Sequence, residues 1–321
     1  MRRCWTLAAL GGQASVGILA PDESPPVSYL QAIVLGLLQG VTELFPVSSL
    51  GHSVILPKLL GWNDIVAAQS ASESYFLAFL VGLHVATALA LFAFYWRTWV
   101  EIIGELLHSL ATRRIETPTQ RLGWLLVVAT IPAGIMGVLF EHVFRTIFAV
   151  PLAAAGLLFV NGIVLAVAEV YRRRAEVRAV AVAHGLNAEG ARRLDTLEFR
   201  EAGVIGVAQV FALLAGISRS GITMAAGLVR GLDHEDAARF SFLLATPIIG
   251  AAGVYKLPDL LGPNGHGVLG QVLAGSLAAA LAAYFSVRFL TRYFTTRTLT
   301  PFAAYCLIAG ALLVGWFALH G

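Results

Sequence analysis

Apolar runs of about 20 residues recur along the chain, and they constrain its fold more than any other feature. A helix needs about 20 apolar residues to cross the hydrocarbon core of a membrane, so we expect six crossings. They are predicted at residues 75–96, 121–140, 150–171, 240–256, 267–290 and 300–320. Only 13% of the residues are charged, against roughly a quarter in soluble domains. Because the ten-residue alternation of membrane β-strands is missing from the sequence, we predict an all-α polytopic membrane protein.

Two further apolar regions, residues 28–62 and 202–232, are each interrupted near the middle by polar residues. The first is interrupted around Pro46, and the second between Gly216 and Arg219. Irregular backbone at membrane depth is tolerated only where it is buried in protein or lines a wet cavity. We therefore predict two re-entrant helical hairpins in addition to the six crossings.

The two hairpins match each other at a constant offset of 170 residues. The matched positions are Gln39 and Gln209, Leu44 and Leu214, Ser48 and Ser218, Ser49 and Arg219, Ser53 and Thr223, and Gly61 and Gly231. This pattern predicts two repeats, residues 28–171 and 202–321, each a hairpin followed by three crossings. Because each repeat contains an odd number of crossings, the second repeat starts on the opposite side of the membrane and has the inverted topology. Inverted repeats with broken helices typically place a ligand site near the membrane midplane.

Arginines cluster in four of the predicted loops, which indicates the sidedness of the chain. Residues 97–121, 172–200, 230–239 and 288–297 hold 4, 7, 2 and 3 arginines, 16 in total. After the N-terminal extension, the segments predicted on the opposite side hold only Lys58, Arg145 and Lys256. The positive-inside rule places the arginine-rich loops, including a loop at residues 172–201, in the cytoplasm and both chain ends outside. The net positive charge is therefore explained by the cytoplasmic loops, and we predict no nucleic-acid partner. Residues 1–27 are predicted to be a poorly ordered N-terminal extension.

The first interruption combines hydroxyls, an imidazole and a carboxylate. It reads Gln39-Gly-Val-Thr-Glu43-Leu-Phe-Pro46-Val-Ser48-Ser49-Leu-Gly-His52. Ser48 or Ser49 is well placed to cap a new helix, whose first backbone N–H groups attract anions. His52 lies three residues after Ser49, on the same helical face. Without further evidence, Ser48 and Ser49 are interpreted as helix caps and His52 as a packing residue. A carboxylate inside a membrane segment costs a few kcal/mol, however, so Glu43 favours a nucleophile with a base and an acidic partner.

The second interruption places a single arginine among hydroxyls, in the order Gly216-Ile-Ser218-Arg219-Ser220-Gly-Ile-Thr223. A guanidinium at the bilayer centre costs roughly 2.5–3.5 kcal/mol, so Arg219 needs an anionic partner. That partner is either Glu43, in a structural ion pair, or a ligand phosphate that matches the planar guanidinium. With the hydroxyls of Ser218, Ser220 and Thr223, this segment has more hydrogen-bond donors than one carboxylate can use. This number of donors favours a phosphate as the partner of Arg219. Two such helix starts at one cavity suit a diphosphate on an apolar lipid tail.

With these two motifs the chain resembles the bacitracin-resistance family of undecaprenyl-diphosphate phosphatases, from about Gln31 onward. The family pattern of an acid or amide, three residues, Glu, then Pro-x-Ser-Ser-x-x-His is matched by Gln39, Glu43, Pro46, Ser48, Ser49 and His52. The pattern Gly-x-Ser-Arg-Ser-x-x-Thr is matched by Gly216, Ser218, Arg219, Ser220 and Thr223. Two departures occur: Gln39 replaces a Glu found in many members, and Ala215 stands where Pro is common.

The resemblance implies hydrolysis of undecaprenyl diphosphate to the monophosphate at the outer face of the bacterial cytoplasmic membrane, which recycles a cell-wall lipid carrier. It implies a divalent cation, Mg²⁺ or Ca²⁺, with Glu43 as its ligand or as an orienting carboxylate. It further implies Ser49 as nucleophile, His52 as its base or proton shuttle and Arg219 as the phosphate clamp. The remaining predicted substrate-binding residues are Gln39, Ser48, Ser218, Ser220 and Thr223.

Three questions stay open at this point. A polyprenyl-phosphate transporter or flippase is the main alternative, because inverted repeats with midplane sites are a transporter architecture. The Ser49 and His52 pair favours an enzyme over that alternative. An ion channel is a third reading, which the lack of a continuous polar stripe along the crossings disfavours. The sequence does not decide whether His84 belongs to the site, and it does not fix an oligomeric state.

Overall fold

The computed structural model describes residues 27–70, 75–148, 150–183, 193–262 and 267–320. Within these residues every regular element is helical, which confirms the predicted all-α membrane fold. Five helices are long and apolar enough to cross a membrane. They are α6 (Pro118–Phe148), α7 (Pro151–Ala183), α10 (His234–Leu261), α12 (Leu269–Tyr293) and α13 (Thr300–His320). Apart from Val27, the predicted extension at residues 1–27 lies outside the described residues.

The sixth predicted crossing differs from expectation. It corresponds to α4 (Tyr75–Phe94), an apolar helix of 20 residues that is followed, after a bend of 84°, by a further helix, α5 (Trp96–Thr112). The prediction of a loop over residues 97–121 is therefore wrong for most of that range. Charged residues in α5 alternate with apolar ones at helical spacing, so one face of the helix buries Trp99 and Ile102.

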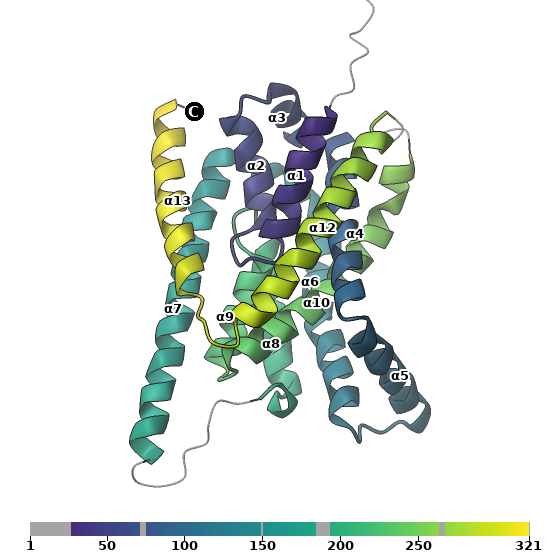
Figure 1. Ribbon diagram of the computed structural model, residues 1–321, viewed down its shortest axis with the longest axis vertical. Coiled ribbons are helices and arrows are strands. Elements are labelled where there is room, and N and C mark those ends of the chain that lie inside the picture. Colours follow the sequence, from purple (N-terminus) through teal and green to yellow (C-terminus); the bar gives the residue numbers. More distant parts are fainter. Residues whose placement is uncertain (1–26, 71–74, 149, 184–192, 263–266, 321) are drawn as a thin grey trace, which may run out of the picture.

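The two interrupted regions form helical hairpins that enter from opposite ends of the molecule. The first consists of α1 (Tyr29–Thr42) and α2 (Ser49–Leu59), followed by α3 (Asn63–Ser70). The second consists of α8 (Phe199–Val210) and α9 (Arg219–Val229), with short 3₁₀ turns at Leu194–Thr196 and Phe211–Leu213. Figure 1 shows α1 and α2 in its upper half and α8 and α9 in its lower half.

The second helices of the hairpins agree at several positions related by the offset of 170. Each second helix has 11 residues and begins directly after a capping serine, Ser48 or Ser218, whose hydroxyl accepts from the backbone N–H three residues later. Each of these helices is followed by a glycine with positive φ, Gly61 at 68° and Gly231 at 93°. These features are what a duplication predicts; the duplication itself stays a prediction.

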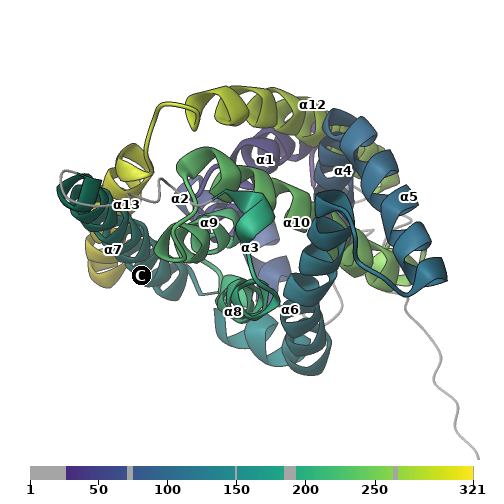
Figure 2. The same ribbon diagram turned by 90° about the horizontal axis from the view of Figure 1, so that it is seen from below.

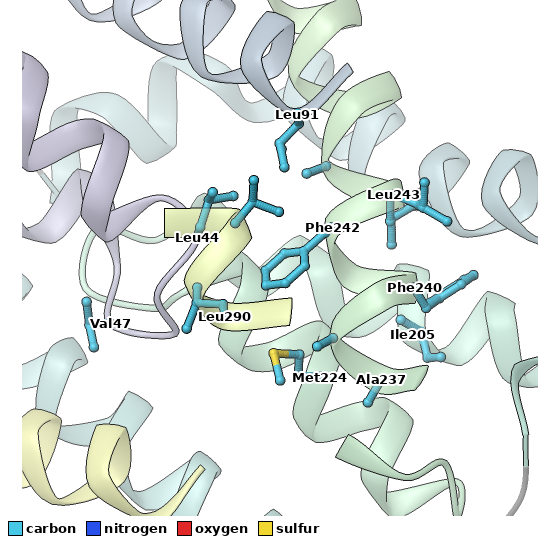
Figure 3. Close-up of a cluster of buried hydrophobic side chains, with 14 of the residues drawn as sticks. Leu44, Val47, Leu91, Ile205, Met224, Ala237, Phe240, Phe242, Leu243 and Leu290 are labelled. Atoms are coloured by element: carbon cyan, nitrogen blue, oxygen red, sulfur yellow. The ribbon is translucent and has the colours of Figure 1, made fainter. Parts of the chain in front are cut away.

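The buried core joins the two hairpins to the crossings around them. In Figure 3, Leu44 from the first interruption and Met224 from α9 lie with Leu91 of α4, Phe242 of α10 and Leu290 of α12. In lipid such side chains stabilise the packing of helices by van der Waals contact, not by removal from water. The polar interruptions are therefore held between apolar layers of neighbouring helices.

The connections predicted to be rich in arginine lie toward one end of the molecule. Figure 1 shows the connection between α5 and α6, the C-terminal half of α7 and the connection between α12 and α13 in the lower half. The start of α1 and the end of α13 lie at the upper end. Seen from below in Figure 2, α7 and α13 pack together at one side, and α12 follows the outer edge.

Candidate active site

Glu43 lies in the first interruption and accepts hydrogen bonds from three side chains. Its Oε2 accepts from the Ser49 hydroxyl at 2.5 Å and from the Gln39 amide at 3.1 Å. Its Oε1 accepts from Arg219, from Nη2 at 3.0 Å and from Nε at 3.3 Å. Glu43 is only 7% exposed, and a buried carboxylate requires partners of this kind. The first residues of α2 and α9, Ser49 and Arg219, therefore meet on one carboxylate.

Arg219 has the protein partner that was one of its two predicted alternatives. Besides the ion pair with Glu43, its Nη1 donates to the backbone carbonyl of Ser241 at 3.4 Å. These bonds use three of the five N–H donors of a guanidinium. Because Arg219 also lines a cavity, the remaining donors can reach a ligand. The ion pair and a phosphate contact are therefore compatible.

His52 does not lie where the predicted base for Ser49 should be. Its Nδ1 is 2.6 Å from the backbone carbonyl of Ser48, and its Nε2 is 2.8 Å from the hydroxyl of Tyr305. A carbonyl oxygen only accepts, so Nδ1 carries the proton and Nε2 accepts from Tyr305. Ser49 is the first residue of α2 and directs its hydroxyl back across the interruption to Glu43, although it shares a helical face with His52. In the structure the hydroxyl of Ser49 bonds to Glu43, and the ring of His52 bonds to other groups.

His84, whose role the sequence left open, belongs to the site. Its Nε2 lies 3.6 Å from Glu43 Oε2, and its Nδ1 lies 2.8 Å from the backbone carbonyl of Leu80. Because that carbonyl holds a proton on Nδ1, the ring turns Nε2 toward the carboxylate. His84 is thus placed to exchange a proton with Glu43.

The other predicted binding residues fall into two groups. Ser48 and Ser218 line the cavity next to Ser49. Gln39, Ser220 and Thr223 are buried but are not among the lining residues. They bond instead to groups behind the site: Gln39 to Glu43, Ser220 to the carbonyl of Phe45, and Thr223 to Ser241. Their observed contacts position the site and do not reach the cavity.

The cavity has a volume of about 350 Å³ and a polar end at Glu43, Ser49, His84 and Arg219. Its walls are mainly apolar side chains: Leu50, Leu80, Val81, Ala133, Ala212, Leu213, Ile217, Ile248, Ile249 and Ala252. The lining positions on α10 run toward its C-terminal end and finish at Lys256. The cavity therefore combines an anion-binding end with a passage suited to a hydrocarbon chain.

Asn161 of α7 connects the two interruptions, and we did not predict its role. Its Nδ2 donates to the carbonyl of Pro46 at 3.0 Å, and its Oδ1 accepts from the backbone N–H of Ser218 at 3.0 Å. The hydroxyl of Ser48 accepts from the N–H of Gly216 at 3.1 Å, which adds a direct link. An isolated amide inside the apolar crossing at residues 150–171 was the signal that could have identified Asn161.

The site offers a divalent cation one protein carboxylate, that of Glu43. Among the described residues, no three His, Cys, Asp or Glu side chains form a group that could hold a metal ion. Gln39 turns its amide N–H toward Glu43, and its buried Oε1, which has no hydrogen-bond partner, is directed away from that carboxylate. Mg²⁺ in phosphate-handling sites often uses one or two carboxylates together with substrate oxygens and water. Glu43 and a bound diphosphate match that coordination.

Comparison with known proteins gives one consistent family. The family model for bacitracin resistance protein BacA matches residues 32–312. An undecaprenyl-diphosphatase of Mycolicibacterium paratuberculosis is 56% identical over 92% of this chain and 99% of its own length. Undecaprenyl-diphosphatase 2 of Frankia alni is 54% identical over 91% of this chain and 99% of its own length. An undecaprenyl-diphosphatase of Gluconobacter oxydans is 42% identical over 88% of this chain and 97% of its own length. The matched region contains both interruptions.

Proposed function

The chain belongs to the bacitracin resistance protein BacA family, and we propose that it hydrolyses undecaprenyl diphosphate to undecaprenyl phosphate and inorganic phosphate. One observation supports this most strongly: Ser49, Glu43 and Arg219 converge at the polar end of an otherwise apolar cavity. A hydroxyl bonded to a carboxylate beside a guanidinium suits attack on a phosphoryl group. The apolar walls suit a substrate that carries a polyprenyl chain.

In the proposed reaction, the Ser49 hydroxyl attacks the terminal phosphorus while its proton passes to Glu43 Oε2. The bond between this phosphorus and the bridging oxygen breaks, and undecaprenyl phosphate leaves with the bonding electron pair and takes up a proton. Water then attacks the phosphoserine, which releases inorganic phosphate and restores the Ser49 hydroxyl. His84 lies beside Glu43 and relays the proton between the carboxylate and the leaving group.

Arg219 and the start of α9 stabilise the charge that develops on the transferred phosphoryl group. Guanidinium and backbone N–H donors act strongly in a site that largely excludes water, because little reorganisation is needed as the reaction proceeds. Ser48 and Ser218 hold the two interruptions in register around the phosphate. A divalent cation bound by Glu43 and the substrate would supply further neutralisation of the diphosphate.

We assign the cavity to the outer face of the bacterial cytoplasmic membrane as part of the same proposal. Two observations support it. The arginine-rich connections lie toward the lower end in Figure 1, which the positive-inside rule assigns to the cytoplasm. The cavity runs along α10 from the interruptions toward Lys256, away from that end. A diphosphate therefore enters from the outer leaflet.

Phosphate release by the purified chain in detergent tests the proposal. Wild-type protein should release phosphate from undecaprenyl diphosphate, and a translocator without hydrolytic activity should not. Ser49→Ala should reduce release to background, and Arg219→Ala should reduce it about 10²- to 10³-fold. Ser53→Ala is the matched control, since Ser53 lies one turn further along α2 and its buried hydroxyl has no hydrogen-bond partner. Equal turnover in all three variants would contradict the assigned site.

A further inference from the structure

A hollow of about 440 Å³ lies at the C-terminal end of α12, and none of the residues that line it belongs to the candidate active site. Its lining includes the guanidinium groups of Arg288, Arg292 and Arg297 and the rings of Phe285 and Phe289. No acidic side chain is among the lining residues. We propose that this hollow, which we call the α12 hollow, binds the headgroup of an anionic phospholipid.

No carboxylate lines the α12 hollow, and of its three arginines only Arg297 also lines a neighbouring hollow that contains Glu169, Asp233 and Glu235. Arg288 and Arg292 are four residues apart, so they share a helical face, where like charges repel each other. The backbone N–H of Arg297 bonds to the carbonyl of Tyr293 at 2.9 Å. This bond keeps Arg297 close to the end of α12, where it lines the same hollow. In the part of the chain that the structure describes, none of the three forms an ion pair. An anionic ligand relieves this repulsion.

The aromatic wall of the α12 hollow is held in place by packing. The Phe289 ring stacks on Phe45, with centroids 5.9 Å apart and an interplanar angle of 3°. It also packs against the ring of Tyr293 at 5.6 Å. Phe289 is nevertheless 52% exposed. The hollow therefore has an apolar surface directly beside three cations. A phospholipid needs both at this point, because its charged headgroup joins its apolar acyl chain there.

An exposed apolar stripe leads from the α12 hollow along the helix. Leu273, Leu277, Leu281 and Phe285 follow one another at four-residue spacing and are 63%, 64%, 53% and 64% exposed. Figure 2 shows that α12 follows the outer edge of the molecule. An acyl chain can lie along this stripe while its phosphate contacts the arginines. This combination selects a phospholipid over a soluble anion, and the excess positive charge selects an anionic headgroup over a zwitterionic one.

Retention of lipid by the full-length protein tests this inference. The protein is reconstituted in bilayers of phosphatidylcholine with phosphatidylglycerol, extracted gently, and analysed for bound lipid by native mass spectrometry. Wild-type protein should retain phosphatidylglycerol selectively. Each arginine removed should weaken that retention about fivefold, so Arg288→Gln combined with Arg292→Gln should weaken it about 25-fold. The single variant Arg297→Gln, outside the helix, should weaken it about fivefold.

Two variants serve as controls for folding and for net charge. Arg288→Lys combined with Arg292→Lys should keep most of the selectivity. Arg113→Gln combined with Arg114→Gln removes the same charge from the connection between α5 and α6 and should leave retention unchanged. Equal retention by wild type and the Arg288 and Arg292 double glutamine variant overturns the proposal. Retention of added polyprenyl phosphate but not of phosphatidylglycerol also overturns it, because the ligand is then the carrier lipid.

Discussion

The Ser49 hydroxyl and the Glu43 carboxylate are joined by a hydrogen bond of 2.5 Å across the interruption between α1 and α2. Bonds of 2.5–2.7 Å between a hydroxyl and an oxygen are characteristic of an ionised acceptor. In the proposed reaction, Glu43 in the preceding half of the hairpin therefore takes the proton from Ser49, and His52 on the following helix does not. This relationship changes which substitutions should abolish activity.

Glu43→Gln should lower kcat about 10²- to 10⁴-fold, because an amide of the same shape cannot take up the Ser49 proton. Phosphate release under saturating substrate measures the effect. Gln39→Ala, which removes a neighbouring bond to the same oxygen, should have a much smaller effect. If the two variants lost activity equally, Glu43 would act only as part of the packing.

His84→Gln and His52→Gln form a matched pair. We expect His84→Gln to lower kcat about 10²-fold, because the ring faces Glu43 in the cavity. We expect His52→Gln to leave kcat within about threefold, because both of its ring nitrogens bond elsewhere. Steady-state kinetics of the two variants decides the matter. The reverse order of effects would restore His52 as the base.

Asn161→Leu should destabilise the protein by about 2–5 kcal/mol, because the carbonyl of Pro46 and the N–H of Ser218 both lose a buried partner. Thermal unfolding in detergent measures the loss. Asn161→Asp keeps an acceptor for Ser218, but it must either bury an unpaired charge or take up a proton, so its melting temperature should also lie below that of wild type. A leucine variant as stable as wild type would show that the two interruptions hold each other without α7.

Gly216→Ala should cost about 1–3 kcal/mol, since Gly216 has a φ of 112° and an added Cβ would overlap the carbonyl oxygen of Ala154. Gly203→Ala in α8 is the matched control: a Cβ there meets no atom within 4 Å, so the change should stabilise by roughly 0.5–1 kcal/mol. Melting temperatures of both variants test the contrast. A shift of the same sign in both would argue against strain at Gly216.

Chelation of divalent cations should abolish phosphate release, and Mg²⁺ should restore it. With one carboxylate available, the cation should bind weakly without substrate and tightly only with the diphosphate. Titration of Mg²⁺ at several substrate concentrations would reveal this coupling. Full activity in the presence of a chelator would remove the cation from the proposal.

Several features of this protein follow directly from its amino-acid sequence. Long apolar runs leave the backbone no choice but helices in a membrane, and a carboxylate and a guanidinium in such runs require partners. The pairing of Arg219 with Glu43 was one of two predicted alternatives for this reason. Capping chemistry, which acts within three or four residues, predicted a helix start after Ser48 or Ser49, and the helix begins after Ser48.

Only the tertiary structure decided the direction of side chains whose partners lie in distant segments of the chain. Ser49 and His52 are close in sequence, yet the interruption turns one toward Glu43 while Tyr305 holds the other. His84 and Asn161 enter the site from α4 and α7, and no local pattern specifies which helix packs against an interruption. Local rules govern capping and burial; the direction of a hydroxyl at a helix start is set by whichever partner the packing of the whole molecule brings within about 3 Å.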